Sequence, residues 1–374
     1  MLADILITPG QIEVSASLTD SGWFIVMSAI KIIVVFSILM AMVAYSVLVE
    51  RKVSAFIQDR LGPNRVALPL IGSIPILGPF LTKLGIWQPL ADGVKSFLKE
   101  DFTPGHVRKI YFWLAPAITM IPALLTVAVI PFGSNIGSQQ MVIANLNVGI
   151  LYTFGIVSLG VYGIVLAGYA ANSKYPFLGG IRSSAQMISY EISMGLSVIP
   201  IFMLVGSLNL SSVISYQTGV SLGFLPNWLI LKQPIAFIVF LVAAFAETNR
   251  LPFDMPECET ELVAGYNTEY SSMKFALFFM GEYSNMIASS AMMVTLFLGG
   301  WTLPGVDPGA LGGVLSILIF LAKVIVLMVV FIWVRWMLPR FRYDQLMNLG
   351  WQRFIPLTLA NIFVTALWLW LRAK

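Results

Sequence analysis

Long apolar stretches fill most of the chain, and shorter polar connections separate them. A helix of about 20 apolar residues is long enough to cross the hydrocarbon core of a bilayer. Stretches that meet this requirement occur at residues 23–48, 110–129, 150–171, 186–205, 228–246, 274–298, 311–338 and 354–371. The pattern therefore predicts an all-α polytopic membrane protein with eight transmembrane helices. The whole chain, residues 1–374, is expected to form one membrane domain.

The fifth stretch is the weakest of the eight. Its uninterrupted apolar part covers only residues 235–246, and Lys232 and Pro234 precede it. A lysine side chain can extend to the membrane surface if it lies near the end of a span. We therefore expect Lys232 to mark that end of the fifth span.

The composition agrees with a chain that lies in a membrane. Charged residues make up 11% of the 374 residues, whereas hydrophobic residues make up 58%, and the mean hydropathy is +0.86. An ordinary soluble domain has about 25% charged residues. So little polar surface excludes a soluble globular protein and a disordered one. Residues 1–22 carry three acidic residues and no basic one, so a signal peptide is not expected.

Basic residues are distributed unevenly between the two ends of the predicted spans. Fifteen lysines and arginines lie in the odd-numbered connections, whereas three lie in the even-numbered connections and the C-terminal tail. Basic residues are enriched on the cytoplasmic side of membrane proteins. The count predicts that both termini lie on the opposite, outer side.

The cysteine and histidine counts restrict the chemistry of the chain. Cys258 is the only cysteine and His106 is the only histidine. The chain therefore cannot hold an iron–sulfur cluster, a cysteine zinc site, a disulfide framework or a bis-histidine haem by itself. It also lacks the glycine-rich motifs of nucleotide-binding sites, and no nucleic-acid partner is expected. Any redox cofactor must lie on another polypeptide.

An amphipathic helix is predicted in the first long basic connection, within residues 87–101. Leu90, Val94, Phe97 and Leu98 fall on one face, and Asp92, Lys95 and Lys99 fall on the other. Such a helix typically lies in the membrane interface in contact with lipid. The alternative is that it forms one wall of a cavity for a lipid-soluble ligand. The acid Asp92 favours this second interpretation slightly.

Acidic residues are concentrated in residues 247–269, where Arg250 is the only cation. Neighbouring carboxylates raise one another's pKa and share protons when they are partly buried. On an exposed loop the same residues would be a solvated surface, but their apolar neighbours favour partial burial. The acids are Glu247, Asp254, Glu257, Glu259, Glu261 and Glu269.

Two further carboxylates, Glu191 and Glu282, lie inside predicted spans. A charge at the bilayer centre costs about 2.5–3.5 kcal/mol on insertion scales, so such residues usually face the protein interior. They indicate a proton route. The alternative is a set of separate ion pairs with cations in the spans, namely Lys31, Lys274, Lys323 or Arg335.

Two long segments, residues 85–100 and 252–265, carry a resemblance to a known family. They are similar to the two signatures of the H subunit of NADH–quinone oxidoreductase, called NADH dehydrogenase subunit 1 in mitochondria. Shorter matches occur at residues 50–52, 60–65, 189–191 and 339–345. The chain departs from the family at residues 66–86, which form a longer apolar stretch where a re-entrant or surface hairpin is expected, and in its long N-terminus.

The resemblance implies a membrane subunit of proton-translocating NADH:quinone oxidoreductase (respiratory complex I), which forms part of the quinone chamber and couples quinone reduction to proton pumping. It implies quinone, with ubiquinone favoured, as the substrate, and it places FMN and the iron–sulfur clusters on partner subunits only. The implied partners are the hydrophilic quinone-site subunits, the small membrane subunits next to the antiporter-like ones, and membrane lipids. A bacterial inner membrane is favoured over a mitochondrial inner membrane.

The resemblance also implies roles for individual residues. Five match family positions in or near the quinone chamber: Glu50, Arg51, Arg60, Asp92 and Phe279. Six match acids that link the chamber to the antiporter-like subunits by proton coupling: Glu191, Glu247, Glu257, Glu259, Glu261 and Glu282.

Two other functions are compatible with parts of the sequence. A related membrane-bound hydrogenase or formate-linked complex would contain a homologous subunit with the same carboxylates. A free-standing secondary transporter is disfavoured, because the two halves of the chain show no internal repeat.

Overall fold

The computed structural model describes residues 18–67, 77–136, 139–221, 225–256, 259–304 and 312–373. Helices account for most of these residues, which confirms the all-α class. Within the described residues, the strands are limited to a short antiparallel pair, β1 (Val220–Ser221) and β2 (Leu225–Pro226). Glu257, Cys258 and residues 68–76 of the apolar stretch lie outside the described residues, as does most of the long N-terminus.

A helix overlaps each of the eight predicted stretches. These helices are α1 (Leu18–Ile57), α5 (Lys109–Thr126), α6 (Gly149–Ala170), α7 (Lys174–Val205), α10 (Pro234–Glu247), α12 (Ser272–Phe297), α13 (Gly313–Met337) and α15 (Ile355–Ala373). Shorter helical segments connect them: α3 (Leu77–Leu84), α4 (Gln88–Leu98), η1 (Val127–Val129), α8 (Leu210–Tyr216), α9 (Leu229–Lys232), α11 (Glu259–Leu262), η2 (Gly265–Asn267), α14 (Tyr343–Asn348) and the π-helical turn η3 (Leu349–Phe354).

Six helical segments of the described chain are long and apolar enough to cross a membrane. They are Ile25–Ile57, Lys109–Val129, Gly149–Ala170, Lys174–Val205, Gly313–Met337 and Tyr343–Arg372. The two other predicted stretches correspond to α10, which is apolar but has only 14 residues, and to α12, which has 26 residues and contains Lys274 and Glu282. The chain is therefore a multi-pass membrane protein.

The fifth predicted stretch is divided into two helices. Gln233 separates α9 from α10 with a backbone conformation of φ −133° and ψ 60°, which is not helical. Pro234 explains the break, because a proline disfavours the α conformation of the residue before it but fits the first turn of a helix. The fifth stretch, residues 228–246, is therefore not one continuous helix, and its crossing of the membrane stays a prediction.

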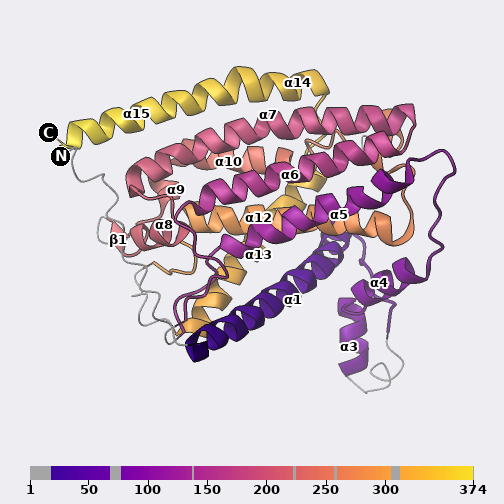
Figure 1. Ribbon diagram of the computed structural model, residues 1–374, viewed down its shortest axis with the longest axis horizontal. Helices are drawn as coiled ribbons and strands as arrows, with labels where there is room; N and C mark the ends of the chain where they lie inside the picture. The colour runs from indigo at the N-terminus through magenta and orange to yellow at the C-terminus, as the bar shows by residue number, and fades with distance from the viewer. Residues whose placement is uncertain are drawn as a thin grey trace.

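Helix α12 lies at the centre of the molecule and contacts α1, α4, α5, α10 and α13. On one side the layers continue outward from α5 and α10 through α6 and α7 to α15, which lies on the outside (Figure 1). On the other side, α1 and α13 cover α12. Because α12 is surrounded, most of its side chains are buried, including those of Lys274 and Glu282.

Glycines permit the closest approaches between the helices of these layers. A Cβ atom at Gly163 of α6 would lie 2.1 Å from the hydroxyl oxygen of Thr119 in α5. A Cβ atom at Gly168 would lie 2.6 Å from the carbonyl oxygen of Pro176 in α7. Small residues at such positions let membrane helices pack against one another.

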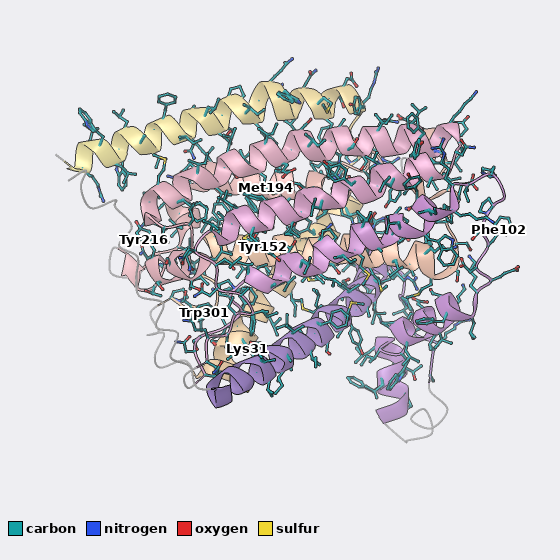
Figure 2. The ribbon with its side chains drawn as sticks, in the orientation of Figure 1. Lys31, Phe102, Tyr152, Met194, Tyr216 and Trp301 are labelled. Carbon is teal, nitrogen blue, oxygen red and sulfur yellow. The ribbon has the colours of Figure 1, made fainter. Side chains whose placement is uncertain are left out.

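The connections that carry most of the basic residues gather at one end of the helices, which we call the basic end. Of the described residues, it comprises 58–67, 77–108, 171–173, 248–256, 259–271 and 338–342, and Figure 1 shows α4 and α14 there. The start of α1, the end of α15 and the α8–β1 region lie at the opposite end. Figure 2 shows Phe102 at the basic end and Lys31 near the opposite end. The outward faces between the ends are apolar, with Ile33 64% and Phe363 77% exposed.

Candidate functional site

Two glutamates and two arginines meet near the basic end, in what we call the buried charge cluster: Glu50, Arg250, Glu282 and Arg335. Glu50 lies in the second-last turn of α1, and its carboxylate accepts hydrogen bonds from Arg335 at the end of α13 and from Tyr283 of α12, the latter at 2.6 Å. Nη1 of Arg250 lies 3.3 Å from the same carboxylate. The four formal charges cancel, as a buried set of charges requires.

Arg250 connects Glu50 to the second acid of the cluster. Its Nη2 atom lies 3.9 Å from Glu282, and Glu282 also accepts a hydrogen bond of 3.0 Å from the Tyr266 hydroxyl. Nη2 and Nε of Arg250 are buried without a hydrogen-bond partner in the described chain. The guanidinium lies 4.2 Å from the centre of the Tyr283 ring, a cation–π contact.

The charge of Arg250 is maintained by its neighbours. Burial lowers the pKa of this guanidinium, but Tyr283, Glu50 and Glu282 outweigh the effect and raise the pKa above its ordinary value. Arg250 therefore remains a cation, and any change in the charge of the cluster must occur on the acids.

A cavity of about 550 Å³ adjoins the cluster, between α1, α4, α12 and α13. Glu50, Tyr283 and Arg335 form one part of its wall. Arg51 and Asp92 form another part and are paired at 2.8 Å. The remaining wall is apolar and comes from residues such as Met40, Val43, Ala44, Phe97, Ala276 and Phe279. The volume falls within the range of small-molecule sites.

Helix α4 forms one side of this cavity through Pro89, Asp92, Ser96 and Phe97. The end of α4 is attached to the start of α12, because the Ser272 hydroxyl lies 3.0 Å from the carbonyl oxygens of both Ser96 and Lys99. Helix α4 therefore forms a wall of a cavity, as the second interpretation expected, and the lipid-soluble ligand of that cavity stays a prediction. Its apolar face remains exposed in the isolated chain, with Phe97 72% and Leu98 82% exposed.

The sequence comparisons agree with this arrangement. Residues 30–366 match the family described as NADH dehydrogenase. The chain belongs to the NADH dehydrogenase family. The match covers all the residues that line the cavity and form the buried charge cluster.

Several relatives within this NADH dehydrogenase family are similar over nearly their whole length. NADH-quinone oxidoreductase H subunit 1 of Cytophaga hutchinsonii is 46% identical over 351 residues, which cover 91% of this chain and 96% of the relative. The corresponding H subunit 2 of Koribacter versatilis is 45% identical, covering 93% and 98% of the two chains. The corresponding H subunit 1 of Geobacter metallireducens is 48% identical, covering 91% and 96%.

Four of the five residues that the family resemblance placed near the chamber line the cavity: Glu50, Arg51, Asp92 and Phe279. The fifth, Arg60, does not. It lies exposed in the loop after α1, where its side chain donates a hydrogen bond to Gln58. The structure thus groups the first four residues and leaves Arg60 outside.

The intramembrane acids lie in two neighbourhoods. Glu282 belongs to the buried charge cluster, whereas Glu191 of α7 accepts a hydrogen bond from Ser158 of α6 and is close enough to Glu247 for the two carboxylates to interact electrostatically. Glu247 is buried, and its Oε2 atom has no hydrogen-bond partner in the described chain.

A small cavity of about 20 Å³ lies beside Glu247. Its polar lining comes from Glu247, Thr126, Thr153, Asn285 and Ser289, and the rest of its lining is apolar. About 10–15 Å³ is enough for one water molecule when polar partners are present. Asn285 lies three residues after Glu282 on α12, which is almost one helical turn. The cavity therefore has room for one water molecule beside Glu247, close to the turn of α12 that follows Glu282.

The expectation that the acids of residues 247–269 crowd beside a single cation is wrong for two of them. Asp254 pairs with Arg340 at 2.7 Å and Glu261 pairs with Arg182 at 2.6 Å, whereas Glu269 lies 3.7 Å from the His106 ring. Arginines from distant parts of the chain therefore separate Asp254 and Glu261. Glu259 is the first residue of α11, and its side chain is not among those described, so the coupling roles of Glu257 and Glu259 remain predictions.

The cations named as alternative partners for Glu191 and Glu282 have other contacts. Lys274 pairs with Asp101 at 3.0 Å, and Lys31 donates hydrogen bonds to Gln139 and the carbonyl of Gln140. Lys323 donates hydrogen bonds to the carbonyls of Leu298, Gly300 and Thr302 at the end of α12. Arg335 binds Glu50.

Sequence reasoning identified Arg250 and Arg335 but not their position between the acids. It missed Tyr266 and Tyr283, which donate hydrogen bonds to Glu282 and Glu50. Tyr283 follows Glu282 directly, and this polar pair within an apolar stretch was a usable signal. Within the described residues, no group of histidine, cysteine, aspartate and glutamate side chains is arranged to hold a metal ion.

Proposed function

We propose that this chain is the membrane subunit of a proton-translocating NADH:quinone oxidoreductase that forms part of the quinone chamber and couples quinone reduction to proton pumping. The names of the relatives support this proposal. The observation that carries it is the cavity of about 550 Å³, which has charged groups on one part of its wall and apolar side chains on the rest.

A quinone has a ring with two hydrogen-bond acceptors and a long apolar tail. The ring fits beside the charged and hydroxyl groups of the cavity, where Tyr283, Arg51 and Arg335 carry donors. The tail fits the apolar wall beside Phe279 and Met40. We propose that the hydrophilic subunits close the rest of the chamber, and that the exposed Arg60 faces them.

Quinone reduction supplies the signal for coupling. Reduction of a quinone to a quinol takes up two electrons and two protons, so a group in the cavity wall that donates one of these protons becomes more negative by one charge until it is reprotonated. We propose that Glu50 takes part in this change because it lies in the cavity wall. Arg250 contacts both Glu50 and Glu282. When the ion pair between Arg250 and Glu50 weakens, the guanidinium of Arg250 is attracted more strongly to Glu282.

We propose that protons then pass among Glu282, Glu247 and Glu191 by way of the water-sized cavity beside Glu247 and Asn285, and onward through the acids of residues 257–261. A group of buried carboxylates that share protons is suited to this task, because each transfer shifts the affinity of the next acid for a proton. Each residue in this route remains a proposal.

We also propose that α12 and the α9–α10 pair cross the membrane, which gives eight spans with both termini outside. With 26 residues, α12 is about 39 Å long, more than the roughly 30 Å of the hydrocarbon core. Its Lys274 and Glu282 are buried and paired inside the protein, so they do not face lipid. On this arrangement α4 lies along the membrane interface. The bacterial relatives support a bacterial inner membrane.

NADH oxidation requires FMN and iron–sulfur clusters, and the proposal assigns these groups to partner subunits. Cluster ligation uses several cysteines, whereas this chain has one. The contribution of this chain is therefore to bind and orient quinone, with ubiquinone favoured, and to move protons.

The proposal is tested by photolabelling with a quinone that carries a reactive group on its ring. In the assembled enzyme we expect peptides from α1 and α12 that contain Glu50 and Tyr283 to be labelled, and excess quinone to prevent the labelling. Labelling that is confined to peptides other than these would contradict the proposal. If no quinone copurifies with the assembled complex either, the hydrogenase or formate-linked alternative gains support.

A further inference from the structure

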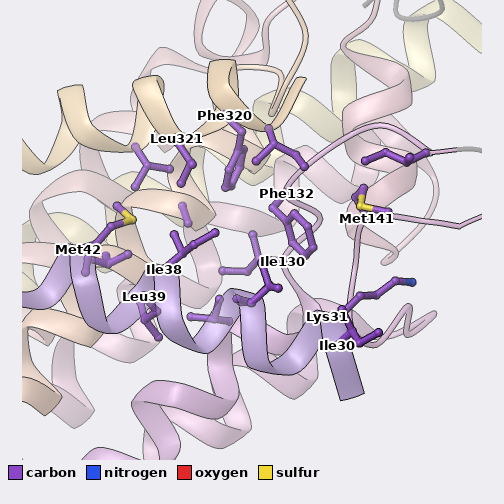
Figure 3. A pocket seen from close by; sticks show the side chains of 18 of the residues that line it. Ile30, Lys31, Ile38, Leu39, Met42, Ile130, Phe132, Met141, Phe320 and Leu321 are labelled. Atoms are coloured by element: carbon purple, nitrogen blue, oxygen red, sulfur yellow. The ribbon is translucent and has the colours of Figure 1, made fainter. Parts of the chain in front are cut away.

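A second cavity, of about 350 Å³, lies toward the end of the molecule opposite the basic end. It is formed by α1, α12, α13 and the connection after η1. Figure 3 shows Ile38 and Leu39 of α1 on one side, Phe320 and Leu321 of α13 on the other, and Ile130 and Phe132 of the connection between them. The lining side chains are almost all apolar, so this cavity has no role in holding water.

Lys31 is the only charged side chain among the residues that line this cavity. Figure 3 shows it at one edge of the cavity, in α1 next to Ile30. Its Nζ atom donates hydrogen bonds to Oε1 of Gln139 at 3.2 Å and to the carbonyl oxygen of Gln140 at 2.9 Å. A lysine ammonium has three donors, and among the described residues these two oxygens are its partners. Within the described part of the chain the third donor has no partner, so it can bind an anion.

The cavity opens sideways to the lipid-facing surface of α1. Ile30 and Val34 line it and are nevertheless 48% and 49% exposed. Ile33, which lies between them in the sequence, is 64% exposed on the same helix. A molecule in the surrounding membrane can therefore reach the cavity without crossing the protein.

The position of Lys31 along α1 matches the depth of one leaflet. Met42, at the other end of the lining, is eleven residues further along the helix, a distance of roughly 16 Å. One leaflet contributes about 15 Å of hydrocarbon to a typical bilayer. A cation at one end of an apolar cavity of this length is complementary to an anionic headgroup joined to an acyl chain.

We propose that this cavity binds one acyl chain of an anionic phospholipid whose phosphate pairs with Lys31. The chain fills the space between α1 and α13, where it covers Ile287 and Ala291 of α12. The lipid thereby completes the packing of the outer half of these three helices. This site shares no lining residue with the larger cavity at the basic end, although the two meet along α1, where Met40 lines the larger cavity and Leu39 and Met42 line this one.

The proposal is tested by photocrosslinking the assembled enzyme in its own membrane. Phe132 is replaced by p-benzoylphenylalanine, and the lipids that become attached are released and identified by mass spectrometry. We expect anionic lipids to be enriched roughly fivefold over their share of the membrane, as one partly exposed charge pair permits. The same replacement at Ile33 samples the lipid around α1 and should give the composition of the bulk membrane.

Charge variants identify the headgroup contact. Lys31→Met should reduce the enrichment at Phe132 to the bulk value, whereas Lys31→Arg should retain it. Lys232→Met provides a matched control, because Lys232 is exposed near the same end of the molecule and contacts Tyr216 instead. It should leave the enrichment unchanged.

Four results would overturn the proposal. Bulk lipid composition at Phe132 of the unmodified chain would show that no anionic lipid is selected. Adducts of an isoprenoid quinone would assign the cavity to the quinone tail, and adducts of a peptide would assign it to a partner helix. Enrichment of anionic lipids that persists in Lys31→Met would show that Lys31 does not bind the headgroup, and the proposed site depends on that contact.

Discussion

Arg250 lies 3.3 Å from Glu50, although 200 positions separate the two residues in the chain. The same guanidinium faces Glu282 across 3.9 Å. One cation thus connects an acid in the wall of the larger cavity to an acid in the central helix. On the proposed function, this contact is the first step between the quinone chamber and the proton route.

Replacing Arg250 by Gln should therefore impair both assembly and turnover. Glu50 and Glu282 would remain buried with one cation fewer, and breaking a buried ion pair costs about 3–5 kcal/mol. We expect a lower thermal midpoint of the assembled enzyme and a loss of most NADH–quinone activity. Both are measured in membranes from cells that express the variant.

Arg342→Gln is the matched control for Arg250→Gln. Arg342 pairs with Asp344 on the surface and is 78% exposed, so its loss should change neither measurement. The double variant Glu50→Gln with Arg250→Gln should recover part of the assembly, because it removes one of the acids left without a cation. Full activity and stability of the single Arg250→Gln variant would show that neither assembly nor turnover depends on the buried charge cluster.

Asp92→Asn should lower NADH–quinone activity and leave NADH oxidation by a hydrophilic artificial acceptor unchanged. The substitution keeps the shape of the side chain but removes the charge that holds Arg51 at 2.8 Å in the cavity wall. We expect the apparent affinity for quinone to fall by several-fold, in line with about 1 kcal/mol for a partly exposed pair. The two activities are measured on the same membranes.

Asp344→Asn makes the same chemical change on an exposed helix away from the cavity and should alter neither activity. Arg60→Ala tests the remaining chamber residue. Because Arg60 lies outside the cavity of the isolated chain, a loss of quinone activity in this variant would support its placement against a partner subunit. Equal losses of both activities in assembled Asp92→Asn would place the defect outside the quinone end.

The contrast between Asp92 and Asp254 indicates what a sequence can predict. The apolar residues around Asp92 recur with the period of a helix, so they predict a helix with one apolar and one polar face. Such a pattern depends on neighbouring residues only, and it is the same in the folded protein. Asp254 was expected to repel its sequence neighbours, but folding brings Arg340 to it from the end of α13. Ion pairs between distant segments depend on how the helices pack, which hydrophobic periodicity does not specify.

The same limit applies to the span count and to α12. Long apolar runs identified the six helical segments that are long and apolar enough to cross a membrane, and Pro234 indicated the short fifth one. A buried central helix needs no continuous apolar surface, because its polar groups are paired inside the protein. Glu282 could thus be identified as an interior acid, but its proximity to Arg250 and Tyr266 could not be predicted.

Lys323→Met should destabilise the outer end of the molecule. Lys323 donates hydrogen bonds of 2.7, 2.9 and 2.7 Å to the carbonyls of Leu298, Gly300 and Thr302. Each buried carbonyl left without a partner costs about 1–3 kcal/mol. We expect a lower thermal midpoint and faster proteolysis of the connection after α12, measured in detergent. Lys232→Met, which removes an exposed lysine at the same end, should show neither effect.

The orientation of the chain is tested with single cysteines in a Cys258→Ser background. The excess of basic residues at the basic end predicts that Ala3→Cys reacts with a membrane-impermeant reagent from outside intact cells. Gln345→Cys, in α14 at the end of the basic connections, should react only after the membrane is opened. Reaction of Gln345→Cys in intact cells would reverse the proposed orientation.

Glu191→Gln and Glu282→Gln should each depress quinone-linked turnover and proton pumping. The two acids lie in separate neighbourhoods, one beside Ser158 and Glu247 and the other beside Arg250 and Tyr266. A water-sized cavity is lined by Glu247 and by Asn285, which lies three residues after Glu282 on α12. If protons pass through both, removing either acid interrupts one route, and the double variant should be little worse than the more damaging single variant.

Independent structural roles predict a different result. If Glu191 and Glu282 only stabilised separate helix contacts, their losses would multiply, and assembly would fall with them. Pumping and quinone turnover are therefore measured in membranes with matched amounts of assembled enzyme, and Glu100→Gln, an exposed acid at the basic end, is the control. Multiplied losses would favour separate pairing, and normal pumping in an assembled double variant would exclude a shared route through these two acids.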